Sequence, residues 1–280
     1  MIDKKELTKI VKRALKEDIG KGDITTKFTI PPDINGLAVI VAKENGVLAG
    51  ANVVKRVFKI VDKDVKFTFH KDDGDRFISG SVIADAQGSA RSLLSAERVA
   101  LNFLQRMSGM ATLTAKYVEK IKGTDAKILD TRKTTPTLRM LEKYAVRVGG
   151  GYNHRMGLYD QILIKDNHIN IGNGITNLLK RIKNVDSNRL FIEIEVKNLR
   201  ELKQVLRFKV NRIMLDNMPI EDIKEAVKLV AGTCELEVSG NVNLRNVKGK
   251  AETGVDYISV GSLTHSYKSI DFSMNMRRIG

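Results

Sequence analysis

The sequence predicts an α/β protein in two parts, the second being an incomplete parallel α/β barrel of roughly six strands. Three observations lead to this prediction. From Ala126 onward, strand-like and helix-like segments alternate regularly, which is typical of βα units on a parallel sheet. The first hundred residues mix helices and strands without that alternation, which indicates a separate α+β layer. Polar residues follow successive barrel strands, at the positions where barrel enzymes carry their active sites.

Apolar spacing defines the elements of the first part. It predicts helices at residues 4–17, 51–61 and 92–107, and strands at residues 37–42, 65–70 and 81–87. Asp73, Gly74 and Asp75 mark a turn. The long helix at residues 92–107 therefore ends the first part.

The second part alternates strands with helices. Strands are predicted at residues 127–129, 161–164, 191–194, 212–215, 235–238 and 257–260. Helices are predicted at residues 136–148, 176–183, 199–206, 220–230 and 242–248. Because a complete barrel of this kind has eight strands, these six predict an incomplete one.

Composition indicates a soluble globular protein. The chain has 280 residues, of which 42% are hydrophobic, enough for one large domain or two moderate ones. No apolar run approaches the roughly 20 residues needed to span a bilayer, and the amphipathic N-terminus lacks a signal-peptide core. We therefore expect a cytoplasmic protein without membrane association. The single cysteine, Cys234, is predicted to be a buried structural thiol.

The net charge of +15 raises the question of nucleic-acid binding. The Lys and Arg residues are spread along the chain, only 5% of residues are aromatic, and no RNA-binding or zinc-finger motif is present. We therefore expect no nucleic-acid partner. The excess charge is expected to be solvated lysine and cations that attract small anions.

The segment at residues 128–168 concentrates cationic side chains. It contains Arg132, Lys133, Arg147, His154, Arg155 and Lys165. A parallel barrel brings residues at its strand ends together at one mouth. The segment therefore predicts a site for a ligand with several negative charges, for which arginine is the most suitable partner.

Polar residues also follow the other predicted strands. These are Glu195, Asp216, Ser239 with Gly240, and Gly261. Each alone reads equally well as a loop residue or a cap. Their joint placement at strand ends is what the rim of an active site requires.

Three motifs carry a resemblance to a known family: DTRKT at residues 130–134, GGGYNHR at 149–155 and IKDNH at 164–168. In this order and spacing they resemble quinolinate phosphoribosyltransferases, and similarity extends through residues 17–26, 95–112 and 257–266. The resemblance implies an α/β sandwich domain at residues 1–107, completed by a return of residues 267–280, and a barrel at 108–266. It also implies a pentosyl-transferring glycosyltransferase of NAD biosynthesis. The enzyme would convert quinolinate and phosphoribosyl pyrophosphate to nicotinate mononucleotide, pyrophosphate and CO2.

The resemblance also implies roles for individual residues. Quinolinate would be bound by Arg132, His154, Arg155 and Lys165, and by Arg98 of a neighbouring subunit, which requires at least a homodimer. The ribose hydroxyls and Mg2+ would be bound by Glu195 and Asp216, directly or indirectly, and Glu193 could share that duty. Phosphate would be bound near Ser239, Gly240, Gly261, Ser262 and His265. The catalytic set would be Lys133, Lys165, Glu195 and Asp216, with no organic cofactor.

One departure from the family pattern lies beside Gly240. Asn241 stands where the family commonly shows a second glycine. Asparagine tolerates a left-handed backbone conformation, so the phosphate loop can keep its shape.

Several alternatives remain open on the sequence. Lys133 or Lys165, beside other cations, could form a Schiff base in a lyase. A basic nucleic-acid-binding module is a second alternative. Related phosphoribosyltransferases that act on nicotinate, and the molybdenum-transport-associated relatives of the family, are a third.

Overall fold

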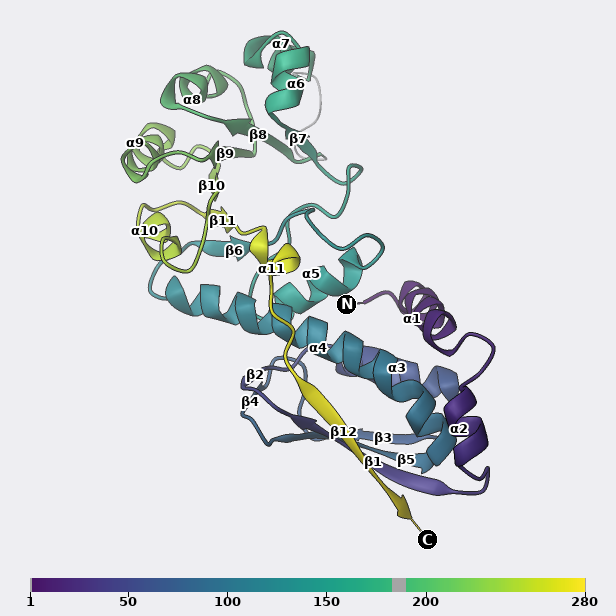
Figure 1. Cartoon of the computed structure of the whole chain (residues 1–280). Helices are drawn as coiled ribbons and strands as arrows, with labels where there is room; N and C mark the ends of the chain where they lie inside the picture. The colour runs from purple at the N-terminus through teal and green to yellow at the C-terminus, as the bar shows by residue number, and fades with distance from the viewer. Residues whose placement is uncertain (1, 183–189, 280) are drawn as a thin grey trace. The chain divides into compact units, whose positions relative to one another are not determined.

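A computed structural model describes residues 2–182 and 190–279 (Figure 1). The chain divides into two compact units. The first unit comprises residues 1–115, 134–150 and 266–280, and the second comprises residues 116–133 and 151–265. The fold predicted from the sequence is confirmed, because one unit contains an antiparallel sheet and the other a six-stranded parallel sheet.

The first unit is built on an antiparallel sheet with the strand order β12-β1-β5-β3. The strands are β1 (Asn35–Ala42), β3 (Lys66–Phe69), β5 (Val82–Ser89) and β12 (Phe272–Ile279), and a small ribbon pairs β2 (Gly46–Val47) with β4 (Arg76–Phe77). Strand β12 pairs with β1 along its whole length, from Asn35 opposite Ile279 to Ala42 opposite Phe272. The C-terminal strand therefore completes a sheet that begins early in the chain.

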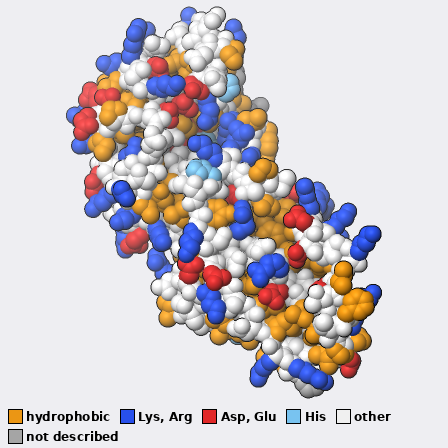
Figure 2. All heavy atoms as spheres, in the orientation of Figure 1, with side chains coloured by type: hydrophobic (Ala, Val, Ile, Leu, Met, Phe, Trp, Pro, Cys, Tyr) orange, Lys and Arg blue, Asp and Glu red, His pale blue; other side chains and the backbone are white. Residues whose placement is uncertain are grey.

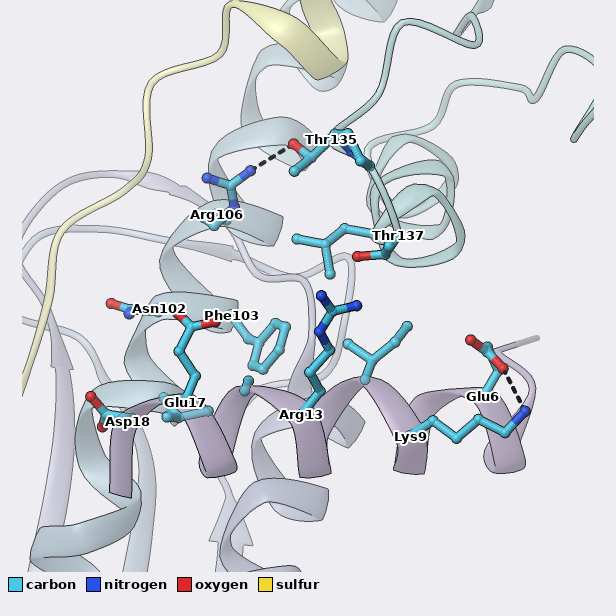
Figure 3. Close-up of a pocket in the computed structure, with 15 residues that line it drawn as sticks. Glu6, Lys9, Arg13, Glu17, Asp18, Asn102, Phe103, Arg106, Thr135 and Thr137 are labelled. Atoms are coloured by element: carbon cyan, nitrogen blue, oxygen red, sulfur yellow. Dashed lines mark hydrogen bonds and ion pairs between the residues drawn. The ribbon is translucent and has the colours of Figure 1, made fainter. Parts of the chain in front are cut away.

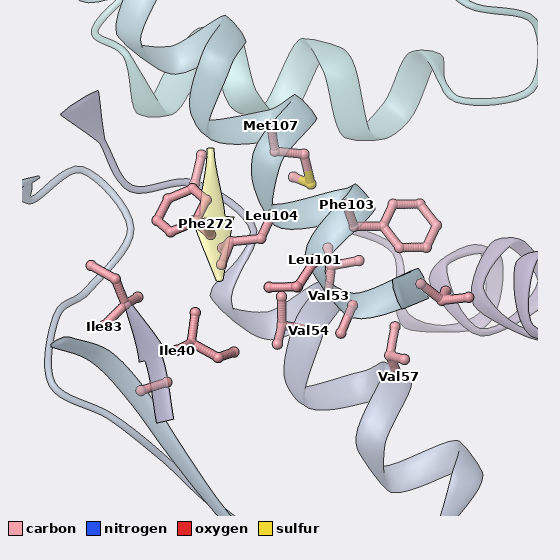
Figure 4. Packing of buried hydrophobic residues seen from close by; sticks show 14 of the residues in the cluster. Ile40, Val53, Val54, Val57, Ile83, Leu101, Phe103, Leu104, Met107 and Phe272 are labelled. Carbon is pink, nitrogen blue, oxygen red and sulfur yellow. The ribbon is translucent and has the colours of Figure 1, made fainter. Parts of the chain in front are cut away.

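The helices that contribute to this unit are α1 (Lys4–Ile19), α2 (Ile24–Thr29), α3 (Ala51–Val61), α4 (Ala90–Lys120) and α5 (Arg139–Val148). Of these, α3 and α4 lie over one face of the sheet (Figure 1). Alternate residues of β1 are buried, so Ile40 faces the helices while its neighbours are partly exposed. Figure 4 shows Val54 of α3 and Leu104 of α4 meeting Ile40 and Phe272. Each such side chain contributes roughly 1.5–3 kcal/mol by leaving water.

Helix α4 continues thirteen residues beyond the predicted end at residue 107. Ser108 and Gly109 do not interrupt it. A Cβ atom on Gly109 would lie 2.3 Å from the carbonyl oxygen of Lys268, so the glycine lets the returning chain approach the helix. The glycine therefore serves close packing and is not a helix end.

The first unit also contains a cavity of about 550 Å3 between α1, α4 and residues 135–138 (Figure 3). Arg106 reaches into this region, where its Nη2 donates to Thr135 Oγ1 at 3.0 Å and lies 3.5 Å from Glu142 Oε1. Arg13 of α1 points toward the same hollow. None of these residues belongs to the site predicted from the sequence.

The second unit is a parallel sheet with the strand order β6-β11-β10-β9-β8-β7. Its strands are β6 (Lys127–Leu129), β7 (Ile162–Ile164), β8 (Ile192–Val196), β9 (Arg212–Asp216), β10 (Glu235–Ser239) and β11 (Tyr257–Ser259). In the part of the chain that the structure describes, no pairing joins the two outer strands β6 and β7. The barrel is therefore incomplete, as predicted.

Helices alternate with these strands. They are α6 (Asp166–Ile171), α7 (Ile175–Arg181), α8 (Leu199–Val205), α9 (Ile220–Val230), α10 (Val247–Ala251) and α11 (Ser262–His265). Figure 1 shows α7 to α10 following one another along one side of the strands. This is the arrangement that repeated βα units produce.

Most predicted elements agree with the structure to within a few residues. The predicted helix at 242–248 is wrong at its start, because α10 begins at Val247. Asn243 causes the delay, since its Oδ1 accepts from the backbone N–H groups of Arg245 and Asn246 and holds a turn there. The predicted end of the helix at 176–183 falls on Lys183, which lies outside the described residues.

The two units differ from the domain division predicted at residue 107. Helix α5 belongs to the first unit, although it lies between two barrel strands in the sequence. Leu141 and Ala145 of α5 are part of the hydrophobic core of that unit. The burial of these side chains in that core, which sequence position does not reveal, agrees with the assignment.

Within the described residues, no helix combines the length and apolarity that crossing a membrane would require. Figure 2 shows Lys and Arg side chains scattered over the visible face and interspersed with Asp and Glu.

Candidate active site

The second unit has a cavity of about 840 Å3 at the carboxyl ends of its strands. Of the thirteen site residues predicted from the sequence, twelve line it: Arg132, Lys133, His154, Arg155, Lys165, Glu195, Asp216, Ser239, Gly240, Gly261, Ser262 and His265. The structure thus brings together residues spread over more than 130 positions of the sequence.

Strand periodicity places these groups in the cavity. In β8, Glu193 and Glu195 alternate with the apolar residues Ile192, Ile194 and Val196, and all five are buried. Because neighbouring residues of a strand point to opposite faces, the glutamates share the face inside the barrel. A strand buried on both faces therefore still delivers carboxylates to the site.

Arg155 is the most deeply placed cation of the cavity. The residue is 8% exposed, and its Nη1 donates to the backbone oxygen of Gln161 at 3.0 Å. Burial and the nearby Arg132 lower the pKa of Arg155, while Glu193 and Asp160 oppose that shift. Among the described residues, no hydrogen-bond partner accepts from its buried Nε. An anionic ligand would supply the missing acceptor.

Asp130 fixes the loop that carries Arg155. This buried carboxylate accepts from the backbone N–H of His154 at 2.9 Å and from the Asn153 side chain. Asp130 was not among the predicted site residues. Its place at the start of the DTRKT motif, directly after a strand, was the signal that could have found it.

The imidazole of His154 is engaged with protein groups through both nitrogens. Its Nδ1 accepts from the backbone N–H of Arg155 at 2.7 Å, and its Nε2 lies 3.2 Å from Glu193 Oε2. The ring therefore lines the cavity without directing a free N–H into it. His168 is held similarly, because its Nδ1 accepts from the backbone N–H of Lys165 at 2.9 Å.

Glu195 and Asp216 form an acidic pair at the ends of β8 and β9. Burial and the charge of Asp216 raise the pKa of Glu195, and Lys165 partly offsets this. The Nζ atom of Lys165 lies 3.8 Å from Glu195 Oε2. A second cation here would relieve the remaining repulsion, and Mg2+ commonly uses one or two carboxylates together with phosphate oxygens and water. These residues fit such an ion.

The loop after β10 is shaped by left-handed residues. Gly240 has φ 87° and Asn241 has φ 50°, so Asn241 adopts the conformation expected of it. A Cβ atom on Gly240 would lie 2.2 Å from Asn217 Oδ1, which also accepts from Asn241 Nδ2 at 2.9 Å. Asn217 was missed on the sequence, because nothing but its position after Asp216 marks it.

The loop after β11 brings Gly261 beneath two basic side chains. A Cβ atom there would lie 3.1 Å from His265 Nε2 and 3.2 Å from Lys133 Cδ. Thr264 holds this region together, since its Oγ1 donates to the backbone oxygen of Lys133 at 2.7 Å. Gly261 therefore allows a lysine and a histidine to crowd the same corner of the cavity.

Buried charges lie below the cavity, inside the barrel. Glu237 and Glu193 are both fully buried. Burial raises the pKa of each to about 7, against the opposing influence of Arg212. Arg212 lies 3.1 Å from Glu237 and donates to Glu235 Oε2 through Nη2 at 2.8 Å. The barrel interior is thus a charge network and not a purely apolar core.

Arg98, the thirteenth predicted residue, does not line this cavity. It lies on α4 in the first unit, where it is exposed. Its neighbours Val99 and Ala100 are buried in the core of that unit, so the helix presents Arg98 to the surface.

An incomplete barrel with clustered cations beside paired carboxylates defines an enzyme that handles a small, multiply charged anion. Comparison with known proteins identifies which one. The chain belongs to the quinolinate phosphoribosyl transferase family, whose N-terminal domain matches residues 23–108 and whose C-terminal domain matches residues 110–275. The resemblance drawn from the sequence motifs is confirmed.

Relatives match along nearly the whole chain. A Bacillus subtilis protein described as a probable carboxylating nicotinate-nucleotide pyrophosphorylase is 44% identical, covering 97% of this chain and 93% of the relative. The crystal structure of NadC from Streptococcus pyogenes has a TM-score of 0.96 and 42% identity, covering 100% of this chain and 99% of the other. The Francisella tularensis nicotinate-nucleotide pyrophosphorylase has a TM-score of 0.93 and 41% identity, with coverages of 99% and 98%.

Proposed function

We propose that this chain transfers the phosphoribosyl group of phosphoribosyl pyrophosphate to quinolinate, with decarboxylation. The products are nicotinate mononucleotide, pyrophosphate and CO2, which is a step of NAD biosynthesis. One observation carries the proposal: a single cavity gathers the cations Arg132, Arg155 and Lys165 beside the acidic pair Glu195 and Asp216. Family membership and the names of the relatives support it.

The cations suit quinolinate because it bears two adjacent carboxylates. Arg155 has a buried Nε to offer, and Arg132 and Lys165 line the same cavity. Arginine and lysine bind carboxylates through charge-assisted hydrogen bonds, which are the stronger kind. His154 closes the floor and orients Arg155, and Arg98 of a neighbouring subunit completes the set.

The acidic pair suits the sugar. Glu195 and Asp216 would bind the ribose hydroxyls and hold Mg2+, directly or through water. The ion, when bound, neutralises charge on the pyrophosphate leaving group. The loops at Ser239 with Gly240 and at Gly261 with Ser262 would hold the 5-phosphate, with His265 beside it.

Positioning and electrostatics would drive the reaction. Lys133 and Lys165 stabilise the anionic groups as pyrophosphate departs, and the pyridine nitrogen of quinolinate bonds to the ribosyl carbon. The resulting pyridinium ring then accepts the electron pair from the broken carbon–carboxylate bond, and that ring carbon takes up a proton. No organic cofactor takes part.

A Schiff-base lyase is less well supported. That chemistry needs a neutral lysine amine, whereas the nearest ion-pair partner of Lys165 is the carboxylate of Glu195. Borohydride trapping of a carbonyl substrate on Lys165 would support the lyase instead.

The direct test is incubation of the purified protein with quinolinate, phosphoribosyl pyrophosphate and Mg2+, with nicotinate as a parallel substrate. We expect nicotinate mononucleotide and CO2 from quinolinate only. Nicotinate lacks the second carboxylate and would leave buried cations unpaired, a defect that sites of this kind reject by about 10⁴-fold. Turnover of nicotinate, or silence on both, would refute the proposal. Homodimerisation, cytoplasmic location and the absence of a nucleic-acid partner stay predictions.

A further inference from the structure

We propose that Glu193 and Glu237 are positioning residues that lock the His154 imidazole with its proton on Nε2 and thereby aim Arg155 at the substrate anion. This fixed tautomer of His154, called the lock below, depends only on residues inside the barrel. Its effect on the binding of quinolinate rests on the function proposed above.

The backbone determines which ring nitrogen of His154 is protonated. The N–H of Arg155 donates to Nδ1 over 2.7 Å. A backbone N–H can only donate, so Nδ1 must present its lone pair. The ring proton therefore sits on Nε2, as in other histidines whose second nitrogen has a fixed partner.

The Nε2 side of the ring faces two carboxylates. Glu193 Oε2 lies at 3.2 Å and Glu237 Oε2 at 3.7 Å, and the side chain of His154 is only 5% exposed. Glu237 is itself held from two other sides, by Arg212 Nη1 at 3.1 Å and by a short hydrogen bond from the Ser259 hydroxyl. The acceptors are thus fixed before any ligand arrives.

Glu193 reaches Arg155 by a second route. Its Oε2 accepts from Gln161 Nε2 at 3.2 Å, and the backbone oxygen of Gln161 accepts from Arg155 Nη1 at 3.0 Å. One buried carboxylate therefore influences both the backbone and the guanidinium of Arg155. Second contacts of this kind hold a functional group within the narrow tolerance that binding needs.

The same three residues have the spacing of a metal site, because ligand atoms of His154, Glu193 and Glu237 lie within 4.8 Å of one another. Arg212 already supplies a cation to this cluster, at 3.1 Å from Glu237. A metal ion would have to share the cluster with that guanidinium. The arrangement favours a positioning network.

Two substitutions at one position test the lock. Glu193→Leu removes the acceptor at similar size, whereas Glu193→Gln retains one acceptor oxygen. Glu235→Gln is the matched control, because Glu235 also binds Arg212 but its side chain is 40% exposed. We expect Glu193→Leu to raise KM for quinolinate about tenfold. This corresponds to the loss of one charge-assisted hydrogen bond between a misplaced Arg155 and the substrate anion. KM for phosphoribosyl pyrophosphate should stay within about twofold, Glu193→Gln should recover most of the loss, and the control should match the wild type.

Nitrogen-15 NMR of the histidine side chains detects directly which ring nitrogen of His154 carries the proton, and it needs no substrate. The chain has four histidines, so a His154→Asn variant assigns the signal. We expect a proton on Nε2 and none on Nδ1 in the wild type and in Glu235→Gln. Glu193→Leu should give a mixture of tautomers, with thermal melting used to verify that the variant folds.

The two readouts separate the lock from the reaction. A proton on Nδ1 of wild-type His154, or equal increases in KM for both substrates in Glu193→Leu, would overturn the inference. If the wild-type protein does not turn over quinolinate yet His154 has the expected tautomer, the proposed function is refuted, whereas the positioning of His154 by Glu193 and Glu237 is supported. If Glu193→Leu does not fold, the wild-type tautomer and the Glu193→Gln kinetics still decide.

Discussion

Lys165 directly follows β7 and Glu195 lies near the end of the adjacent parallel strand β8, and their charged groups meet at the mouth of the barrel, with Nζ 3.8 Å from Oε2. The lysine side chain is 47% exposed, whereas that of the glutamate is 9% exposed. The largely buried carboxylate thus lies beside the terminal Nζ of a lysine that lines the cavity. A lysine placed in this way can bind an incoming anion without leaving its strand end.

Replacement of Lys165 is expected to impair quinolinate use. Lys165→Met should reduce kcat/KM for quinolinate about 10- to 100-fold, because a hydrogen bond to a charged group contributes roughly 1.5–3 kcal/mol. Steady-state kinetics measure the effect. Lys228→Met is the control, since Lys228 pairs with Glu225 on the surface at 4.0 Å and lies outside the cavity lining. Equal activity of the two variants would remove Lys165 from the site.

Arg98 is expected to act in the site of a neighbouring subunit. Arg98→Ala and Lys165→Met proteins, each of low activity alone, should regain activity when they are mixed and allowed to exchange subunits, because each mixed dimer assembles one intact site. Random exchange of a dimer predicts about a quarter of the wild-type activity. Activity of the mixture is compared with that of each variant alone. If the mixture stays inactive although mixed dimers are detected by mass spectrometry, Arg98 serves its own subunit or none.

Metal dependence is expected to involve the acidic pair. Chelation of Mg2+ should abolish turnover, and Glu195→Gln should raise the Mg2+ concentration for half-maximal rate, because a carboxylate is the harder ligand. The control is Glu252→Gln, whose carboxylate lies 3.7 Å from Lys248 on the surface. Full activity in the presence of chelator would exclude the ion from this reaction.

Stability is expected to fall with pH through Glu237. Burial raises its pKa from 4.5 to about 7 in the folded chain. The protonated form therefore contributes stability that is fully present below about pH 4.5 and is lost as the pH rises through about 7. Glu237→Gln should remove this loss, which amounts to at most about 3 kcal/mol.

Urea unfolding between about pH 4.5 and 8 measures the difference. The free energy of unfolding of the wild type, relative to Glu237→Gln, should decrease with pH. Glu235→Gln, at a 40% exposed position on the same arginine, should keep the wild-type slope. If the free energy of unfolding changed with pH in the same way for all three proteins, the raised pKa of Glu237 would be contradicted.

Local patterns were sufficient to predict the strands of the barrel. FIEIEV is recognised by apolar residues at every second position and RIMLD by a short continuous apolar run, and both patterns depend only on nearby sequence. The same local order placed Arg132, Lys165, Glu195 and Asp216 after strand ends, and twelve of thirteen predicted residues share one cavity. Elements set by distant contacts were predicted less well. Helix α4 continues past Gly109. The glycine is there because residue 268 packs closely against the helix, a contact between positions far apart in the sequence.

The sequence by itself determined the alternation of strands and helices, the gathering of cations at strand ends, and the motifs that mark the family. Tertiary structure alone decided that helix α5 packs with the first unit, that Asp130 and Asn217 support the site, and that His154 meets Glu193 and Glu237 inside the barrel. The physical reason is the range of the interactions. Periodicity and capping act over a few residues, whereas buried charges find partners only when the curved sheet brings strands together and excludes water between them.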